Sequence, residues 1–250
     1  MTDPRRADGI GPDEWKRRAA IAAVAEVVDG MVLGLGSGST AMLAVEALAA
    51  RIASERLRIV AIPTSRKTAA LARRLGVPLT SFADHRRIDL TIDGADQIEA
   101  ASLTMLKGLG GALLREKIVA AASRRMVVVA DQGKLVDRLD HRTPLPVEIV
   151  TFGWEATLDR LTELGGATAL RMGPDAGPFV TDGGNYIVDC LFAQGLDEPA
   201  ALARCVGALP GVVESGLFVG LASRAYIGGT GGVAVLDHDD RIGSATRAST

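Results

Sequence analysis

The chain has 250 residues, of which 48 % are hydrophobic and 23 % are charged. This composition is typical of a main domain with a packed core, alone or with a smaller partner domain. The formal charge is −2, from 28 basic and 30 acidic residues. We therefore expect no nucleic-acid partner.

Other features of the sequence predict the cellular compartment of the protein. No run of about 18 apolar residues is present, so we expect no membrane span and no membrane partner. Residues 1–11 are polar and lack the apolar segment of a signal peptide. The two cysteines, Cys190 and Cys205, are too far apart for a C-x-x-C pair and predict neither a disulfide framework nor a zinc site. These features predict a cytoplasmic protein.

The first part of the chain alternates between strand and helix patterns. Helical spacing of apolar residues covers 13–28, with Asp13 as the expected N-cap, and then 40–52, 65–75 and 112–123. Short apolar runs that are typical of buried strands cover 31–35, 57–62, 88–92 and 126–130. Such alternation predicts right-handed βαβ units, and therefore an α/β fold with a Rossmann-like, mainly parallel sheet.

The pattern changes after about Asp140. Strand patterns near 147–150, 169, 179–190 and 212–213 are interleaved with helical patterns at 155–164 and 199–206. This order predicts a smaller α+β domain of the split βαβ, ferredoxin-like type at about 141–218. Residues 226–227 and 233–236 are expected to return to the first sheet, so the catalytic domain would comprise 1–140 and about 219–250.

A glycine-rich turn, Gly-Leu-Gly-Ser-Gly-Ser-Thr at 34–40, joins an expected strand to an expected helix. Backbone N–H groups at a helix N-terminus, together with hydroxyls, form a phosphate-binding cradle, here from Ser37, Gly38, Ser39 and Thr40. The spacing matches neither the G-x-G-x-x-G motif of dinucleotide sites nor the Gly-Lys-Ser/Thr of a P-loop. The turn therefore fits one phosphate monoester, and the alternative is a tight turn without a ligand.

An acidic loop, Asp93-Gly94-Ala95-Asp96, follows the expected strand 88–92. The carboxyl ends of strands are where open α/β sheets bind ligands. The two carboxylates would then bind sugar hydroxyls and transfer protons. The alternatives are an Asx turn, in which Asp96 caps the next segment of the chain, and a magnesium site.

A third segment places a lysine before a second glycine-rich loop, at 107–111, and a glutamate in the helix after that loop. Lys107 and loop N–H groups would stabilise negative charge on a substrate oxygen. Burial of Glu116 among leucines would raise its pKa towards that of a general base, whereas a nearby lysine would lower it. Alone, Glu116 also fits an ordinary surface pair with Lys117. Lys134, after the strand 126–130, fits either a phosphate or sugar contact or a solvated loop lysine.

The order of these motifs closely resembles the type A ribose-5-phosphate isomerase family. The resemblance includes Ile-Pro-Thr-Ser at 62–65, Leu-Leu-Arg-Glu-Lys at 113–117, Leu-Pro-Val-Glu at 145–148, Thr-Asp-Gly-Gly-Asn-Tyr-Ile-Val-Asp at 181–189 and Pro-Gly-Val-Val-Glu-Ser-Gly-Leu-Phe at 210–218. It extends from about Trp15 to Val235, which is nearly the whole chain.

The resemblance implies an enzyme that interconverts D-ribose 5-phosphate and D-ribulose 5-phosphate through a cis-enediolate, in the non-oxidative pentose phosphate pathway. It implies a small sugar phosphate as partner, no cofactor, no metal, and a homodimer or homotetramer. Glu116 would be the general base, Asp93 and Asp96 would handle hydroxyls and ring opening, and Lys107 would stabilise the intermediate. The implied substrate contacts are Ser37, Gly38, Ser39, Thr40, Asp93, Gly94, Ala95, Asp96, Lys107, Gly108, Gly110 and Lys134.

Three positions depart from the family pattern. Gln97 stands where the family usually has a glutamate, Leu109 replaces a glycine of some relatives, and Gly183 stands where asparagine is frequent. The cradle tolerates Leu109 only if this residue needs no positive φ. Two other functions remain open: a non-catalytic sugar-phosphate sensor, which would need no base, and a coenzyme A transferase with a glutamate nucleophile.

Overall fold

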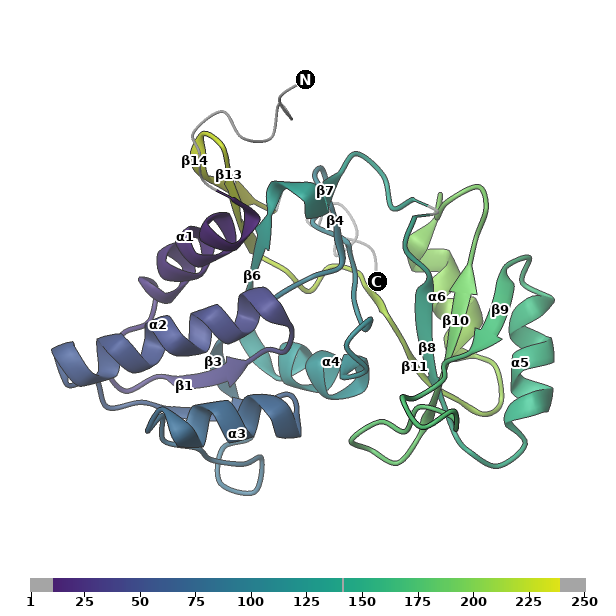
Figure 1. The fold of residues 1–250 in the computed structure, drawn as a ribbon, viewed down its shortest axis with the longest axis horizontal. Helices are drawn as coiled ribbons and strands as arrows, with labels where there is room; N and C mark the ends of the chain where they lie inside the picture. The colour runs from purple at the N-terminus through teal and green to yellow at the C-terminus, as the bar shows by residue number, and fades with distance from the viewer. Residues whose placement is uncertain (1–10, 141, 239–250) are drawn as a thin grey trace, which may run out of the picture.

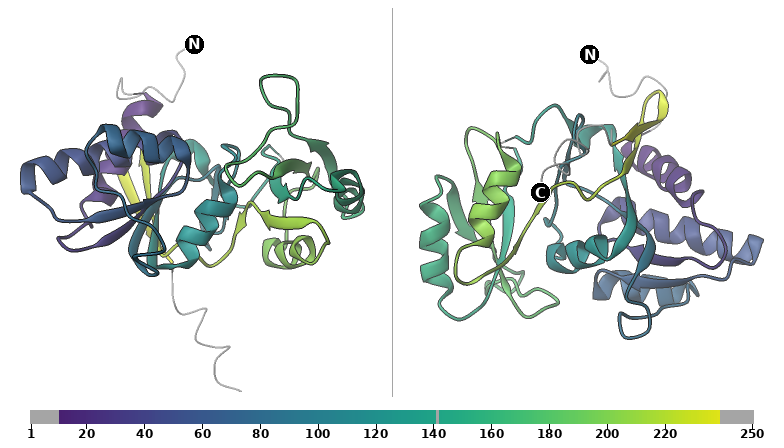
Figure 2. Two further views of the ribbon diagram at one scale, coloured as in Figure 1. Left: turned by 90° about the horizontal axis from the view of Figure 1, so that it is seen from below. Right: turned by 180° about the vertical axis from the view of Figure 1, so that it is seen from behind.

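The structure, a computed structural model, describes residues 11–140 and 142–238. It has two bodies that lie side by side (Figures 1 and 2). The larger body is built on a six-stranded sheet and the smaller body on a four-stranded sheet. The predicted α/β fold with a smaller α+β domain is therefore confirmed.

The six-stranded sheet has the order β14-β13-β6-β3-β1-β2. Its strands are β1 (Val32–Leu35), β2 (Val60–Pro63), β3 (Ile88–Asp93), β6 (Ser123–Asp131), β13 (Arg224–Gly229) and β14 (Gly232–Asp237). All neighbours pair in parallel except β14, which forms an antiparallel edge hairpin with β13. The end of the described chain thus returns to the first sheet, as predicted.

Both faces of this sheet are covered by helices. The helices are α1 (Pro12–Val24), α2 (Ser39–Glu55), α3 (Arg66–Arg74) and α4 (Leu113–Ala121). Alternate residues of β6 enter different cores: Val127 and Val129 pack with α1 and α2, whereas Val128 and Ala130 face the side that includes Ala120 of α4. This arrangement explains why β1, β2 and residues 126–130 of β6 carry no polar side chain, since parallel strands are buried on both faces.

The smaller body has a four-stranded antiparallel sheet in the order β11-β8-β10-β9. Its elements are β8 (Leu145–Ile149), α5 (Trp154–Thr162), β9 (Ala167–Leu170), β10 (Tyr186–Leu191), α6 (Pro199–Gly207) and β11 (Val212–Ser215). Strand, helix, strand, strand, helix and strand follow one another as the split βαβ type requires. We propose domain boundaries near residues 141 and 218; positions 1–10, 141 and 239–250 of the expected domains lie outside the described residues.

A third sheet, in the order β12-β5-β4-β7, was not predicted. It consists of β4 (Gln97–Glu99), β5 (Met105–Leu106), β7 (Leu135–Val136) and β12 (Leu217–Phe218), with a 3₁₀ turn at Gln132–Lys134 before β7. Strands of two or three residues contain too few positions to show a periodicity. This sheet matters for the site because β5 leads directly into Lys107.

Two local predictions were wrong. The cap of α1 is Gly11, without a side-chain cap bond, and Asp13 lies in the first turn. Pro12 starts the helix earlier because its fixed φ suits the first helical position. The strand expected at 179–190 begins only at Tyr186, because the Thr181 hydroxyl accepts the N–H groups of Gly183 and Asn185 and so holds a turn.

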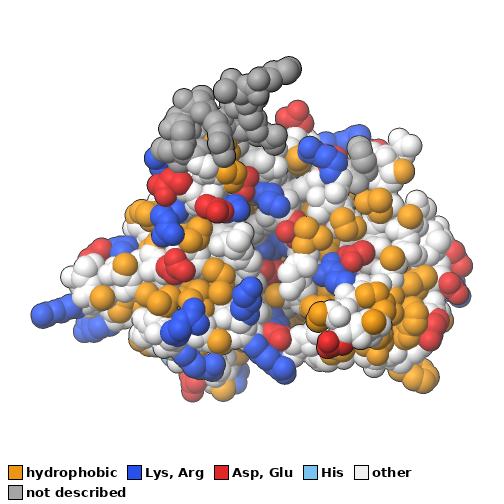
Figure 3. Space-filling view, in the orientation of Figure 1, with side chains coloured by type: hydrophobic (Ala, Val, Ile, Leu, Met, Phe, Trp, Pro, Cys, Tyr) orange, Lys and Arg blue, Asp and Glu red, His pale blue; other side chains and the backbone are white. Residues whose placement is uncertain are grey.

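Charged and hydrophobic side chains are distributed differently on the surface. On the face seen in Figure 3, basic and acidic side chains are interspersed, and hydrophobic side chains gather over the smaller body. Within the described residues, no helix combines the length and apolar character that crossing a bilayer would need.

Candidate active site

One cavity brings together four segments that are far apart in the sequence. They are the turn after β1, the loop after β3, the loop before α4 with the first turn of that helix, and the turn after β6. The cavity thus lies at the carboxyl edge of the parallel sheet, where such folds bind ligands. Every predicted site residue except Asp93 lines it: Ser37, Gly38, Ser39, Thr40, Gly94, Ala95, Asp96, Lys107, Gly108, Gly110, Glu116 and Lys134.

Asp93 lies beneath the cavity and joins the first two segments. Its side chain is fully buried, and its Oδ1 accepts the N–H groups of Ser37 at 3.0 Å and Gly94 at 2.7 Å. The bond to Gly94, the next residue, is not the Asx turn that was one of the alternatives, because an Asx turn bonds the N–H group two residues on. Glycine is required at position 36, because a Cβ there would lie 2.0 Å from the Asp93 carboxylate. The turn after β1 can approach the acidic loop only without this side chain.

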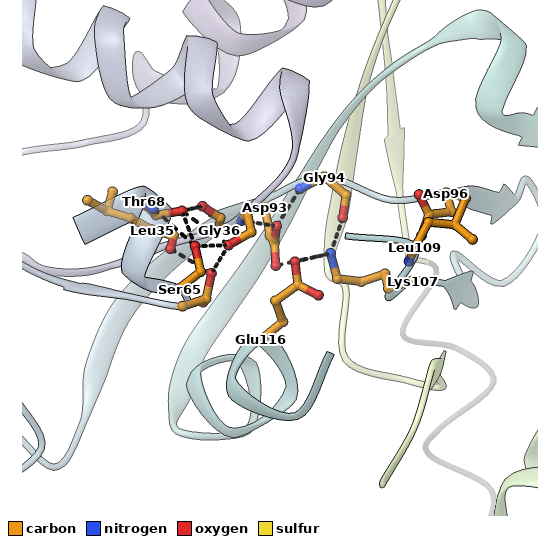
Figure 4. A network of polar contacts seen from close by, with 12 residues as sticks. Leu35, Gly36, Ser65, Thr68, Asp93, Gly94, Asp96, Lys107, Leu109 and Glu116 are labelled. Carbon is orange, nitrogen blue, oxygen red and sulfur yellow. Dashed lines mark hydrogen bonds and ion pairs between the residues drawn. The ribbon is translucent and has the colours of Figure 1, made fainter. Parts of the chain in front are cut away.

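A cluster of hydroxyls supports the glycine-rich turn from behind (Figure 4). The Ser37 hydroxyl lies 2.8 Å from those of Thr64 and Ser65 and 3.1 Å from that of Thr68. Thr64 and Thr68 in turn donate to backbone carbonyls of the turn, at 3.0 and 2.9 Å. Ser37 therefore bonds to protein groups while it lines the cavity. The sequence analysis did not single out Thr68, because the family motif Ile-Pro-Thr-Ser ends at residue 65. A threonine within a helix gives no sign of a functional role.

The turn presents the start of α2 to the cavity. Gly38 is the N-cap residue, and Ser39 and Thr40 are the first residues of the helix. Backbone N–H groups in the first turn of a helix have no partner within the helix and favour an anion. Lys134, half-buried in the turn after β6, adds a positive charge to the same lining. This end of the cavity is suited to a phosphate.

Lys107, which also lines the cavity, lies between two carboxylates. Its Nζ is 3.1 Å from Asp93 Oδ2 and 3.3 Å from Glu116 Oε1, and it donates to the Gly94 carbonyl at 2.5 Å (Figure 4). Lys107 and Glu116 are only 2 % and 4 % exposed. The alternative that Glu116 forms a surface pair is therefore wrong; Lys117 instead bonds Glu214 at 2.7 Å.

Burial and charge set the protonation of these groups. Burial, reinforced by the negative charge of Asp93, raises the pKa of Glu116 to about 8, although Lys107 opposes the shift. Burial also raises the pKa of Asp93 against the opposing effect of Lys107. Burial alone would lower the pKa of Lys107, but the Asp93 and Glu116 carboxylates outweigh it and raise this pKa. Lys107 thus stays charged, and Glu116 has the proton affinity of a useful general base.

Asp96 lines the cavity, whereas Gln97 points away from it. Oδ2 of Asp96 accepts the N–H of Leu109 at 2.9 Å. Leu109 is not among the non-glycine residues with positive φ in the described chain, so this loop tolerates it without strain. The buried Gln97 amide donates to Asp140 at 2.6 Å and accepts the Asp140 N–H at 3.0 Å. Gln97 therefore supports the segment that leads to the smaller body. Gly183, the third departure from the family pattern, lies in the smaller body itself.

Within residues 11–140 and 142–238, no group of three or more His, Cys, Asp or Glu side chains is arranged to hold a metal ion. The interpretation of Asp93 and Asp96 as a magnesium site thus gains no support. A buried carboxylate with a raised pKa beside a buried ammonium, in one cavity with the start of a helix, is the arrangement expected of a proton-transfer enzyme.

Comparisons with known proteins identify the family. A family profile described as ribose 5-phosphate isomerase A (phosphoriboisomerase A) matches residues 60–232. The ribose-5-phosphate isomerase A of Roseiflexus castenholzii is 52 % identical over 90 % of this chain and 96 % of its own length. The chain therefore belongs to the ribose 5-phosphate isomerase A family, and its predicted class, an aldose–ketose isomerase, is confirmed.

Solved structures agree with this assignment. The ribose 5-phosphate isomerase A of Methanocaldococcus jannaschii has a TM-score of 0.86 and 37 % identity, over 90 % of this chain and 99 % of its own. A D-ribose-5-phosphate isomerase in complex with phospho-erythronic acid has a TM-score of 0.88 and 34 % identity, over 91 % of this chain and 100 % of its own.

Proposed function

We propose that the protein interconverts D-ribose 5-phosphate and D-ribulose 5-phosphate, with Glu116 as the general base. The observation that carries the proposal is the buried Glu116 carboxylate, which shares one cavity with Lys107 and with the start of α2. The complex of a related isomerase with phospho-erythronic acid adds support, since this ligand combines a phosphate with a sugar acid.

In the proposed mechanism, the substrate phosphate binds the cradle of residues 37–40 and Lys134. In the open-chain aldose, Glu116 removes the proton from the carbon beside the carbonyl, which gives a cis-enediolate. A proton passes from O2 to O1 of the enediolate, and the same carboxyl group then delivers its proton to C1, which gives the ketose. A placed base of this kind contributes about 10²–10⁴-fold to the rate.

Lys107 and loop N–H groups would stabilise the enediolate oxygens, and each such donor is worth about 2.7–4 kcal/mol of barrier. Because Asp93 is buried beneath the cavity, we assign it the role of holding Lys107 and the turn after β1. Asp96, which lines the cavity, is the carboxylate that we assign to sugar hydroxyls and ring opening.

The two other functions account less well for the site. A sensor would need the phosphate cradle but no carboxylate of raised pKa. A coenzyme A transferase would use its glutamate as a nucleophile, whereas Oε1 of Glu116 is paired with an ammonium.

The proposal is tested by adding ribose 5-phosphate and EDTA to the purified protein and measuring ribulose 5-phosphate. We expect rapid conversion without coenzyme A. Binding of ribose 5-phosphate without conversion would contradict the proposal in favour of the sensor, and loss of conversion on adding EDTA would contradict a metal-free reaction.

We further propose a cytoplasmic homodimer or homotetramer that acts in the non-oxidative pentose phosphate pathway without a cofactor. The family resemblance supports this assembly, and light scattering of the purified protein tests it. A monomeric mass at concentrations that give full activity would contradict it.

A further inference from the structure

The loop that carries Lys107 has a partner in the smaller body. Arg171, the residue after β9, donates from Nη1 to the carbonyls of Gly108 at 2.9 Å and Leu109 at 3.1 Å. These are two consecutive peptide groups of the loop 107–111. The smaller body itself therefore reaches the catalytic loop.

The guanidinium group is itself fixed in place. Nε of Arg171 donates to Asp189 at 2.8 Å, and Nη2 donates to the second oxygen of the same carboxylate. The ring of Phe179 lies 5.9 Å from the guanidinium carbon. The Arg171 and Asp189 side chains are 14 % and 24 % exposed. A two-pronged ion pair of this kind holds its geometry better than an exposed single contact.

The contact decides which way the loop peptides face. In a trans peptide the C=O and N–H point in opposite directions. Because Arg171 holds the carbonyls of Gly108 and Leu109, the N–H groups of Leu109 and Gly110 are directed away from it. The Leu109 N–H donates to Asp96, and Gly110 lines the cavity beside Glu116. A positive charge on the carbonyl side also polarises these peptides and strengthens their N–H groups as donors.

We propose that Arg171, oriented by Asp189, is a positioning residue for the isomerase reaction. From the smaller body it fixes the loop 107–111. The Leu109 N–H then holds Asp96, and the Gly110 N–H is presented to the substrate oxygens. Arg171 does not line the cavity, and its effect passes through the loop. This inference rests on the proposed function.

The test compares kcat and KM for ribose 5-phosphate in Arg171→Ala, Arg171→Lys and Asp189→Asn. We expect Arg171→Ala to lower kcat by about 10- to 100-fold, as misplacement of reacting groups by about 1 Å does, with a smaller change in KM. Arg171→Lys should restore little, because an ammonium cannot hold two carbonyls and a carboxylate in one plane. Asp189→Asn should also lower kcat, but by less than Arg171→Ala does.

Arg160→Ala is the matched control. Arg160 belongs to the same body, on α5, and forms an exposed ion pair with Glu163 at 3.8 Å, so its loss should leave kcat and KM unchanged. Low, non-denaturing guanidinium chloride should restore part of the activity of Arg171→Ala, whereas sodium chloride of equal ionic strength should not.

Three outcomes would overturn the inference. If the wild type is active and every Arg171 and Asp189 variant has the same kcat, the proposed function stands but Arg171 has no positioning role. Losses that match the fraction of unfolded protein, measured by circular dichroism, would reduce Arg171 to a structural contact. An inactive wild type would overturn the proposed function, and the inference with it.

Discussion

At the scale of single residues, the protonation of Glu116 depends on a balance among three buried groups. Burial and Asp93 favour the neutral acid, whereas Lys107 favours the carboxylate, and the pKa of Glu116 rises to about 8 as a result. One ammonium cannot fully compensate two carboxylates in a medium of low dielectric constant. The proposed base is therefore strong near neutral pH.

This balance predicts the pH dependence of the reaction. A general base must be deprotonated, so kcat/KM should fall about tenfold per pH unit below the pKa of Glu116, near 8. Because Lys107 lowers this pKa, Lys107→Met should move the acid limb to higher pH and reduce the plateau. The measurement is kcat/KM for ribose 5-phosphate across this range. An acid limb at the ordinary glutamate pKa would contradict the assignment.

The same shift predicts how stability changes with pH. The pKa of Glu116 is about 8 in the folded protein and near 4.5 in the unfolded chain. Between these values the folded state binds the extra proton, so a rise in pH through this window lowers the free energy of unfolding, by an amount on the order of a few kcal/mol. Glu116→Gln keeps the neutral shape and removes the titration. Its stability relative to wild type should increase from pH 5 to pH 8.

Urea unfolding at the two pH values measures this difference. Glu163→Gln, an exposed change next to the end of α5, is the control and should show no such trend. A Glu116→Gln variant that loses stability relative to wild type as the pH rises would contradict the raised pKa.

At the scale of elements, the segment 216–218, which comprises Gly216 and the short strand β12, positions Lys107. The Gly216 carbonyl accepts the Lys107 N–H at 2.9 Å, and the Gly216 N–H donates to Pro146 at 2.7 Å. The buried ring of Phe218, on β12, lies 5.5 Å from the Lys107 ammonium. The chain that returns from the smaller body therefore holds the lysine from two directions.

Gly216→Ala tests this contact. A Cβ at this position would lie 2.2 Å from the Lys107 carbonyl, so the strands must separate. We expect a loss of about 1–3 kcal/mol in stability, as for other overpacked sites, together with a lower kcat. Gly207→Ala is the control, because a Cβ there meets no atom within 4 Å. Equal stability and kcat for Gly216→Ala and wild type would show that the segment 216–218 does not position Lys107.

The elements differ in how well the sequence predicts them. The strands and helices of both main sheets were predicted, because each repeats its apolar residues over several positions. The third sheet was not, since β5 and β12 have two residues each and depend on pairing between distant segments. The cap of α1 was misplaced because Asp13 is a common capping residue, while Pro12 favours an earlier start.

At the scale of the whole molecule, the site joins two bodies whose sequences show different patterns. The motif order predicted which residues line the cavity. Those after β1, β3 and β6 follow strands of one parallel sheet, whereas Lys107 follows β5 of the third sheet. It did not predict that Asp93 lies beneath the lining, since spacing does not show burial. It also did not single out Arg171, which contacts a loop more than 60 positions earlier in the chain. Such contacts depend on how the bodies pack.

The central claim is that Glu116 carries the proton between the two carbons of the substrate. The direct test is conversion of ribose 5-phosphate in deuterated water by wild type and Glu116→Gln, with NMR detection of deuterium in ribulose 5-phosphate and a separate measurement of ligand binding. We expect the wild type to introduce solvent deuterium at C1. Glu116→Gln should bind ribose 5-phosphate but lose both conversion and exchange by about 10²–10⁴-fold. A folded Glu116→Gln that converts and exchanges at the wild-type rate would contradict the account.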